Sequence, residues 1–117
     1  MINIVSSSRY KLDRKSLQEQ TQAALVQYGV PYETALNVVF VGKRKMREIA
    51  NTYKNEDVAL PVLSFAYKEQ VGEQENLLGE VIICYPQAVL LAAERGKAVD
   101  QMLNALIVHG IENIMTK

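Results

Sequence analysis

The only histidine of the chain, His109, lies near the end of the sequence, and Asn113 follows it four residues later. A histidine with a second donor at i+4 is how one face of a helix offers two ligands to a metal ion. A single histidine beside an apolar helical stripe is more often a half-buried residue that hydrogen-bonds to its neighbours. The residues alone therefore leave a metal ligand and a structural role open for His109.

No other catalytic group has a clear motif around it. Ser64 lacks the flanking glycines of a nucleophile elbow, and Cys84 lies in an apolar run that predicts burial. Glu80 stands at the start of a predicted strand. Two interpretations of this residue are open: a general base, or a carboxylate that is simply solvated. A catalytic zinc takes three protein ligands, and the chain has no second histidine to help His109.

The net charge of zero conceals a marked asymmetry. Residues 1–54 hold nine Lys and Arg against four Asp and Glu, whereas residues 55–117 hold four against nine. One basic cluster consists of Lys43, Arg44, Lys45 and Arg47. Such a cluster attracts phosphate backbones through counterion release, and it is also typical of a solvated helix face. RNA binding by these residues is one of two open interpretations.

A strongly patterned helix is expected to position His109 and Asn113. It begins near residue 98, and its apolar positions keep the spacing of one buried stripe: Val99, Met102, Leu103, Leu106, Ile107 and Ile114. At about 100° per residue, His109 and Asn113 lie together on the flank of that stripe. We therefore expect both side chains to face whatever the helix packs against, rather than bulk water.

The remaining periodicities predict strands at 2–5, 36–41, 62–67 and 79–85, and helices at about 14–28, 43–53 and 86–95. The third and fourth strands are expected to pair as a hairpin across a polar loop at 68–76. The order β-α-β-α-β-β-α-α predicts an α+β fold, in which a small four-stranded mixed sheet packs against helices. Residues 1–117 are expected to form a single domain.

Composition narrows the class of protein. A hydrophobic fraction of 49% and a charged fraction of 22% are typical of globular domains. The single cysteine excludes an intramolecular disulfide. No stretch approaches 18 apolar residues, and the first residues do not resemble a signal peptide. We therefore expect a cytoplasmic location and no membrane partner.

Four blocks of sequence, in order and with matching gaps, resemble the YbeY family of ribosomal RNA maturation factors, which are metal-dependent endoribonucleases. The first is Leu-Asn-Val-Val-Phe-Val-Gly at 36–42 with the helix at 46–53. The second is Tyr-Lys-Asn-Glu-Asp at 53–57 with Val-Leu-Ser-Phe at 62–65. The third is Leu-Leu-Gly-Glu-Val-Ile-Ile-Cys at 77–84, and the fourth is Gly-Lys at 96–97 with Leu-Ile-Val-His-Gly at 106–110.

The resemblance implies a metal site in which only part of the family pattern is present. In the family, the last block continues as His-Gly-x-x-His-Leu-x-Gly-Tyr-Asp-His, and three histidines hold one metal, usually taken to be zinc. Here His109 matches the first ligand, Asn113 stands at the second, and the chain ends at Lys117 before the third. An amide oxygen is a weaker zinc ligand than an imidazole nitrogen. Since losing even an outer partner costs roughly 10 to 100-fold in affinity, we expect zinc binding to be weak or absent.

The resemblance also implies a catalytic residue, Lys54, at the position of a family arginine proposed to act on the RNA. Lysine keeps the charge but lacks the planar fork that grips phosphate with two bonds. Asn55 replaces a family glycine, and Ala-Leu-Pro at 59–61 replaces Pro-Thr-Asp. Departures near the site combined with matches in the scaffold are typical of a non-catalytic or truncated relative.

The resemblance therefore implies a YbeY-like protein of ribosomal RNA maturation with a degenerate or truncated metal site. Its expected partner is ribosomal RNA or the ribosome, and its expected cleft lies between the last helix and the connection 54–65. If it cuts RNA, a metal on His109 would polarise water or phosphate while Lys54 steadies the anion. The alternative is a non-catalytic RNA- or ribosome-binding module of the same fold. A further interpretation is a homo-oligomer that pairs through the C-terminal helix.

Overall fold

The computed structural model describes residues 1–67 and 76–116. The elements follow the predicted order: β1 (Ile2–Val5), α1 (Arg14–Gln27), β2 (Ala35–Val41), α2 (Lys43–Lys54), β3 (Val62–Ala66), β4 (Leu77–Cys84), α3 (Tyr85–Glu94) and α4 (Val99–Met115). The α+β class is thus confirmed. Most of the loop predicted at 68–76 lies outside the described residues.

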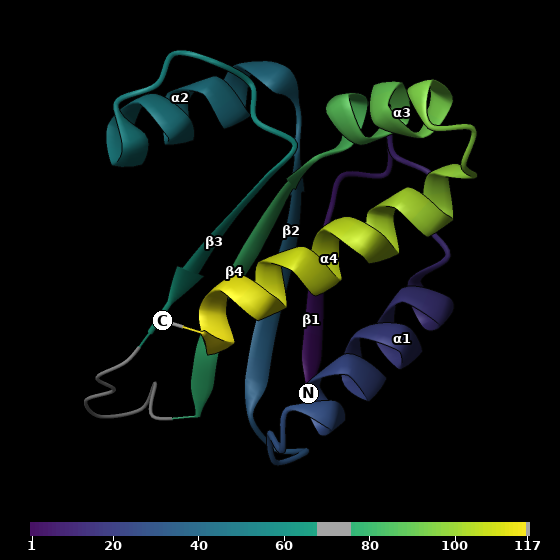
Figure 1. Ribbon diagram of the computed structural model, residues 1–117, viewed down its shortest axis with the longest axis vertical. Coiled ribbons are helices and arrows are strands. Elements are labelled where there is room, and N and C mark those ends of the chain that lie inside the picture. The colour runs from purple at the N-terminus through teal and green to yellow at the C-terminus, as the bar shows by residue number, and fades with distance from the viewer. Residues whose placement is uncertain (68–75, 117) are drawn as a thin grey trace.

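The four strands form one mixed sheet in the order β1-β2-β4-β3 (Figure 1). β1 and β4 both pair with β2 in parallel, while β3 pairs with β4 in antiparallel fashion, as predicted for the hairpin. The strand registers align one residue from each strand in a single row across the sheet: Asn3, Asn37, Glu80 and Phe65. Because side chains alternate along a strand, these four residues share one face.

The opposite face of the sheet carries the larger core. Leu36, Val38 and Phe40 point to this face from β2, as their alternation predicts, and all three are buried. They pack with Leu17 and Leu25 of α1 and with the buried stripe of α4. Figure 1 shows α4 running diagonally across this face, with α1 beside it near β1. α4 therefore packs against both the sheet and α1.

The second face carries a smaller core under α2. Met46 and Ala50 of α2 pack against Leu63, Ile82 and Cys84 of the sheet. The predicted burial of Cys84 is confirmed, and this burial raises the pKa of its thiol. α2 and α4 consequently lie on opposite faces of the sheet.

Local signals set the ends of several helices. The Asp13 side chain accepts a hydrogen bond from the Ser16 amide at 3.1 Å and so caps α1. Pro86 lies in the first turn of α3. Gly29 and Gly96 follow α1 and α3 with positive φ values of 75° and 63°, which glycine adopts readily. Among the described helices, none is long and apolar enough to cross a membrane.

Candidate functional site

His109 and Asn113 both lie on α4, but the structure corrects the expectation for His109, which faces solvent rather than a packed surface. His109 is exposed and Asn113 is half-buried. Asn104, Val108 and Glu112 of α4 line a groove together with residues of α1. At about 100° per residue, His109 and Asn113 lie on the other flank of the helix. His109 is exposed because that flank points away from α1, on the side of the sheet's edge strand β3.

The described residues do not fit the zinc site that a complete family motif would supply. His109 and Asn113 offer one imidazole nitrogen and one amide oxygen from successive turns of α4. Within residues 1–67 and 76–116, no group of three or more His, Cys, Asp or Glu side chains could hold a metal ion. A catalytic zinc takes three protein ligands and a water. This donor set is therefore too small for tight zinc binding.

Lys54 is the last residue of α2, and its side chain is exposed. α2 and α4 pack on opposite faces of the sheet, so Lys54 and His109 belong to helices on opposite sides of it. The groove that α4 lines lies against α1, and the pockets beside α2 that the described residues form include no residue of α4, so neither is the predicted cleft between α4 and the connection 54–65. Asn55 follows with φ 56°, a left-handed conformation that glycine favours and asparagine tolerates. The exchange of the family glycine for Asn55 therefore keeps the local backbone.

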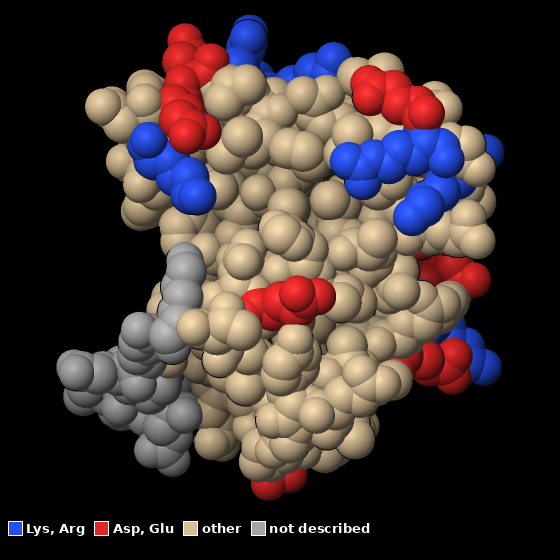
Figure 2. Space-filling model, in the orientation of Figure 1, with Lys and Arg blue, Asp and Glu red and all other residues tan. Residues whose placement is uncertain are grey.

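The basic cluster lies along the first half of α2. Lys43, Arg44, Lys45 and Arg47 are all exposed, while Met46 between them is buried. Lys45 lies 4.0 Å from Glu48, a loose surface ion pair. In Figure 2, Lys and Arg atoms lie along the upper edge over α2 and α3, with Asp and Glu atoms among them, and the surface over α4 is mostly uncharged. The cations are thus presented to solvent beside the sheet rather than used to hold the fold together.

A pocket that sequence reasoning missed lies on the α2 face of the sheet. It has a volume of about 310 Å³ and is lined by Ile49, Tyr53, Phe65, Tyr67, Glu80 and Ile82. Asn37 donates a hydrogen bond to Glu80 Oε2 at 3.3 Å, and Asn3 donates to Asn37 at 2.9 Å. Burial raises the pKa of Tyr67, and the neighbouring Glu80 carboxylate, which accepts a hydrogen bond from it, raises that pKa further. Glu80 is therefore held inside a polar row, not at a solvated strand end.

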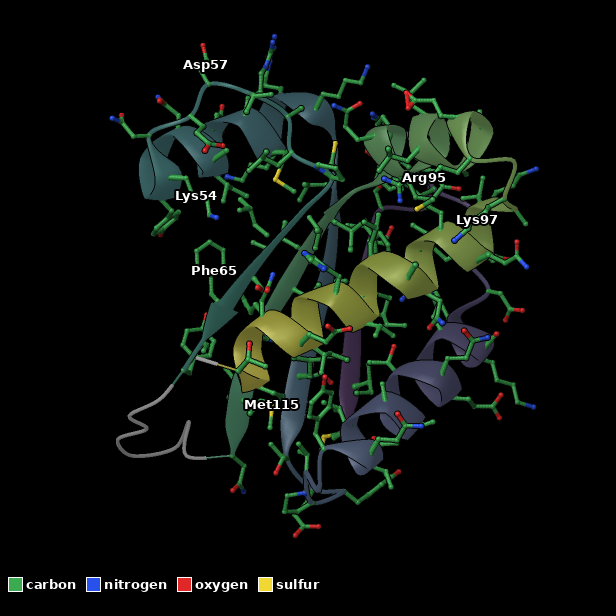
Figure 3. All side chains as sticks on the ribbon, in the orientation of Figure 1. Lys54, Asp57, Phe65, Arg95, Lys97 and Met115 are labelled. Carbon is green, nitrogen blue, oxygen red and sulfur yellow. The ribbon has the colours of Figure 1, made fainter. Side chains whose placement is uncertain are left out.

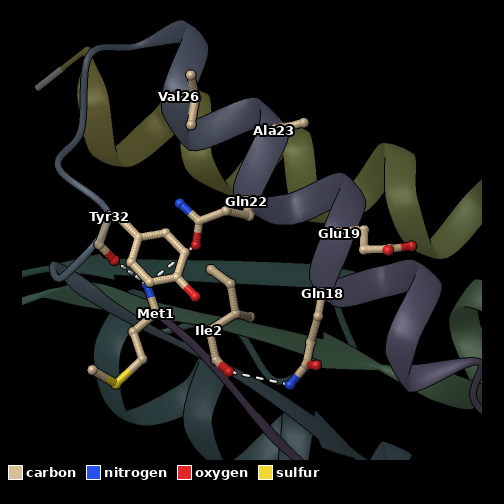
Figure 4. Close-up of a pocket in the computed structure, with 8 residues that line it drawn as sticks. All are labelled: Met1, Ile2, Gln18, Glu19, Gln22, Ala23, Val26 and Tyr32. Carbon is tan, nitrogen blue, oxygen red and sulfur yellow. Dashed lines mark hydrogen bonds between the residues drawn. The ribbon is translucent and has the colours of Figure 1, made fainter.

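A larger hollow of about 700 Å³ lies between α1 and the start of β1 (Figure 4). The Met1 ammonium group donates hydrogen bonds there to the Tyr32 carbonyl at 2.6 Å, the Thr34 carbonyl at 2.9 Å and Gln22 Oε1 at 3.2 Å. Burial lowers the pKa of this amino group. These bonds tie β1 to α1 and to the connection before β2. The hollow has a structural explanation, and we do not assign it a ligand.

Comparison with known proteins identifies a family and agrees with this fold. The family model described as Endoribonuclease YbeY matches residues 3–115. An Endoribonuclease YbeY from Macrococcus caseolyticus is 29% identical over 113 residues, which cover 90% of this chain and 73% of that protein. One from Moorella thermoacetica is 32% identical over 108 residues, covering 86% and 69%. One from Azoarcus is 36% identical over 83 residues, covering 68% of this chain but 33% of that protein.

A solved structure supports the fold independently. The solution structure of a Thermotoga maritima protein superposes with a TM-score of 0.69 at 20% sequence identity, covering 100% of this chain and 73% of the other. At this identity, the likeness concerns the fold alone. The family match spans nearly the whole chain, from β1 to the last turn of α4. The chain belongs to the YbeY endoribonuclease family.

Proposed function

We propose that this chain binds RNA in ribosomal RNA maturation, as an endoribonuclease-family protein whose metal site is degenerate. The observation that carries the proposal is the exposed basic cluster of α2, whose one ion pair among the described residues is the loose contact between Lys45 and Glu48. Ribosomal RNA or the ribosome is the proposed partner. A cytoplasmic location and self-association through α4 stay predictions.

The position of the cluster on α2 is electrostatically unfavourable for the folded chain. Lys43, Arg44 and Lys45 occupy the first turn, and the helix has no acidic residue there. The Gly42 cap offers no side-chain acceptor. The unpaired amide groups at a helix N-terminus carry a partial positive charge, which adds to that of the three side chains. Such a concentration of positive charge suits an anion such as an RNA phosphate.

Reversing one of these charges should therefore affect stability and binding in opposite directions. We expect Arg44→Glu to raise the free energy of unfolding by about 1 kcal/mol, because a carboxylate suits a helix N-terminus. The same change should lower affinity for single-stranded RNA roughly tenfold at low salt. Urea denaturation and fluorescence anisotropy measure the two quantities. Arg95→Glu, at the far end of α3 (Figure 3), changes the net charge equally and should leave RNA affinity unchanged.

The metal part of the proposal is that the 117-residue chain on its own holds zinc weakly. His109 is the anchor that the family likeness assigns, with Asn113 in a weak second position. Lys54 stays the proposed catalytic residue, because its charge is exposed at the end of α2. In this proposal, Lys54 and the cluster 43–47 bind the phosphates of the RNA.

His109→Ala tests the metal part. We expect whatever metal-dependent RNA cleavage the chain retains to fall at least roughly tenfold in this variant, with RNA affinity unchanged. Metal content, cleavage of a labelled single strand and anisotropy are measured on the same samples. Glu112→Ala, an exposed neighbour on the α1 side of α4, is the matched control. Full cleavage activity in His109→Ala would exclude His109 as the metal anchor.

The second candidate function is the non-catalytic RNA- or ribosome-binding module. It is favoured by the small donor set, because His109 and Asn113 alone do not complete a catalytic zinc site. The same measurements of RNA binding and cleavage distinguish the two functions. RNA binding through the α2 cluster without cleavage at any metal concentration would identify the chain as the non-catalytic module.

A further inference from the structure

The pocket of about 310 Å³ beside the end of α2 has a defined construction. Ile82 and Glu80 of β4 come from the sheet, while Phe65 and Tyr67 come from the edge strand and the residue after it. Ile49 and Tyr53 of α2 complete the lining. α2 packs on the sheet rows that contain Ile82 and Cys84, and its Tyr53 contacts Phe65 in the next row, where Asn37 and Glu80 are half-buried. A volume near the lower end of the range for small-molecule sites suits one planar ring system.

Aromatic rings in this pocket are unusually open to solvent. Tyr53 is 67% exposed and Tyr67 is 39% exposed, although both border an apolar surface. The Tyr53 and Phe65 rings meet edge to face, with centroids 5.0 Å apart and an interplanar angle of 66°. In such a pair, at least one face of the Tyr53 ring is not covered by Phe65. An exposed aromatic face over an apolar floor is what nucleobases stack on.

Glu80 determines which ligand groups the pocket accepts. Its carboxylate accepts hydrogen bonds from the Asn37 amide and the Tyr67 hydroxyl, and both partners also lie at the pocket or beside it. An ionised carboxylate only accepts hydrogen bonds and has about four lone-pair sites, so acceptor capacity remains for a ligand. The ligand must therefore donate hydrogen bonds from its edge.

The donor pattern selects one base. Guanine presents two adjacent donors on its Watson–Crick edge, the ring N1–H and the exocyclic amino group, and these match the two oxygens of one carboxylate. Adenine and cytosine place a single amino donor beside an acceptor nitrogen, which a carboxylate repels. Uracil places one N–H between two carbonyl oxygens. This edge is free only in an unpaired base.

Cations adjoin the pocket where a nucleotide's phosphate would lie. Lys54 directly follows the pocket residue Tyr53 at the end of α2, and Figure 3 shows it above Phe65. The exposed cluster 43–47 continues along the same helix. From the aromatic faces, the Glu80 carboxylate and these cations, we propose that the pocket binds one unpaired guanine of a single-stranded RNA. The proposal rests on the proposed RNA-binding function and names the base that the site prefers.

Two probes test the proposal separately from RNA binding in general. The first is guanosine monophosphate, which should shift the NMR ring signals of Tyr53, Phe65 and Tyr67 at lower concentration than adenosine or uridine monophosphate. The second is a set of labelled five-nucleotide RNAs, in which a central guanine, inosine or adenine is flanked by uridines. We expect affinity roughly tenfold higher for guanine than for adenine. Inosine, which lacks the amino group, should lie between them.

Variants locate the preference in the pocket. Glu80→Gln should abolish the guanine preference without weakening binding of the adenine strand. Tyr53→Leu, at an exposed position whose loss leaves the core intact, should lower affinity for the guanine strand roughly tenfold. Glu94→Gln and Tyr32→Leu are matched controls, since Glu94 is exposed on α3 and Tyr32 is 71% exposed outside this pocket. Thermal melts confirm that each variant is folded.

The outcomes are distinguishable. Equal affinity for all strands, or a preference that survives both pocket variants, would overturn the guanine site and leave the RNA-binding proposal standing. Ring shifts with guanosine monophosphate but no affinity for any strand would support the base site and overturn the RNA-binding proposal. Neither ring shifts nor strand binding would overturn both.

Discussion

Gly79→Ala should destabilise the chain by about 3 kcal/mol or more, a large part of the total stability of a domain of this size. A Cβ atom at this position would clash with the Phe65 carbonyl oxygen and lie 3.2 Å from Ile114 Cδ1. The nearest of these atoms is backbone of the paired strand, so it cannot move aside as a side chain does. The substitution therefore forces β3 away from β4. Urea denaturation, followed by circular dichroism, measures the loss.

Gly42→Ala is the matched control for this substitution. There the added Cβ atom lies 3.2 Å from the Tyr10 hydroxyl, the movable end of a side chain, so the cost should stay below about 1 kcal/mol. A Gly79→Ala variant with the wild-type denaturation midpoint would show that β3 is held less closely against β4 than the structure indicates. Because Phe65 and Tyr67 border the pocket, Gly79→Ala should also weaken the guanine preference proposed above.

Asn113→His should increase the affinity of the chain for Zn²⁺. The change places two imidazoles at i and i+4 on one flank of α4, where His109 is already exposed. We expect affinity for Zn²⁺ to rise at least roughly 100-fold, since the gain of a direct ligand exceeds the 10 to 100-fold effect of an outer partner. A ligand that binds only the folded chain also stabilises it. Zn²⁺ should therefore raise the melting temperature of the variant and not of the wild type.

The control for Asn113→His is Asn51→His, which adds one histidine at an exposed position of α2, far from His109 in the fold. Zn²⁺ should leave its melting temperature unchanged. An equal response of Asn51→His and Asn113→His would mean that the extra affinity comes from any surface histidine. A wild-type chain that already binds Zn²⁺ as tightly as Asn113→His would contradict the degenerate site.

Most of the fold follows from the sequence because its signals are local. The alternation of Leu36, Val38 and Phe40 specifies both a strand and the face that it buries. Asp13 and Gly29 define the start and end of α1 through a cap and a left-handed residue. These features depend on neighbours in the sequence, so periodicity and capping residues were enough to predict them.

The site could be predicted only in part, because it depends on contacts between distant segments. The helical wheel placed His109 on a flank of α4 correctly, but it could not show that this flank faces away from α1. The pocket with Glu80 was missed because strand register brings Asn37, 43 residues earlier, beside it. One signal was available: Asn3, Asn37 and Glu80 each interrupt an apolar strand with a polar residue. The strand registers bring these three interruptions into one row of the sheet.

The proposed RNA binding by this chain depends on the basic cluster of α2 and not on a bound metal. Its most direct test is the affinity for a single-stranded RNA, measured from low to moderate salt with and without a chelator. We expect the logarithm of affinity to fall linearly with the logarithm of salt concentration, with a slope of up to about −3 if all four cations of the cluster 43–47 contact phosphates. The same line should be obtained with the chelator. Affinity that is lost with the chelator, or that does not change with salt, would contradict the account.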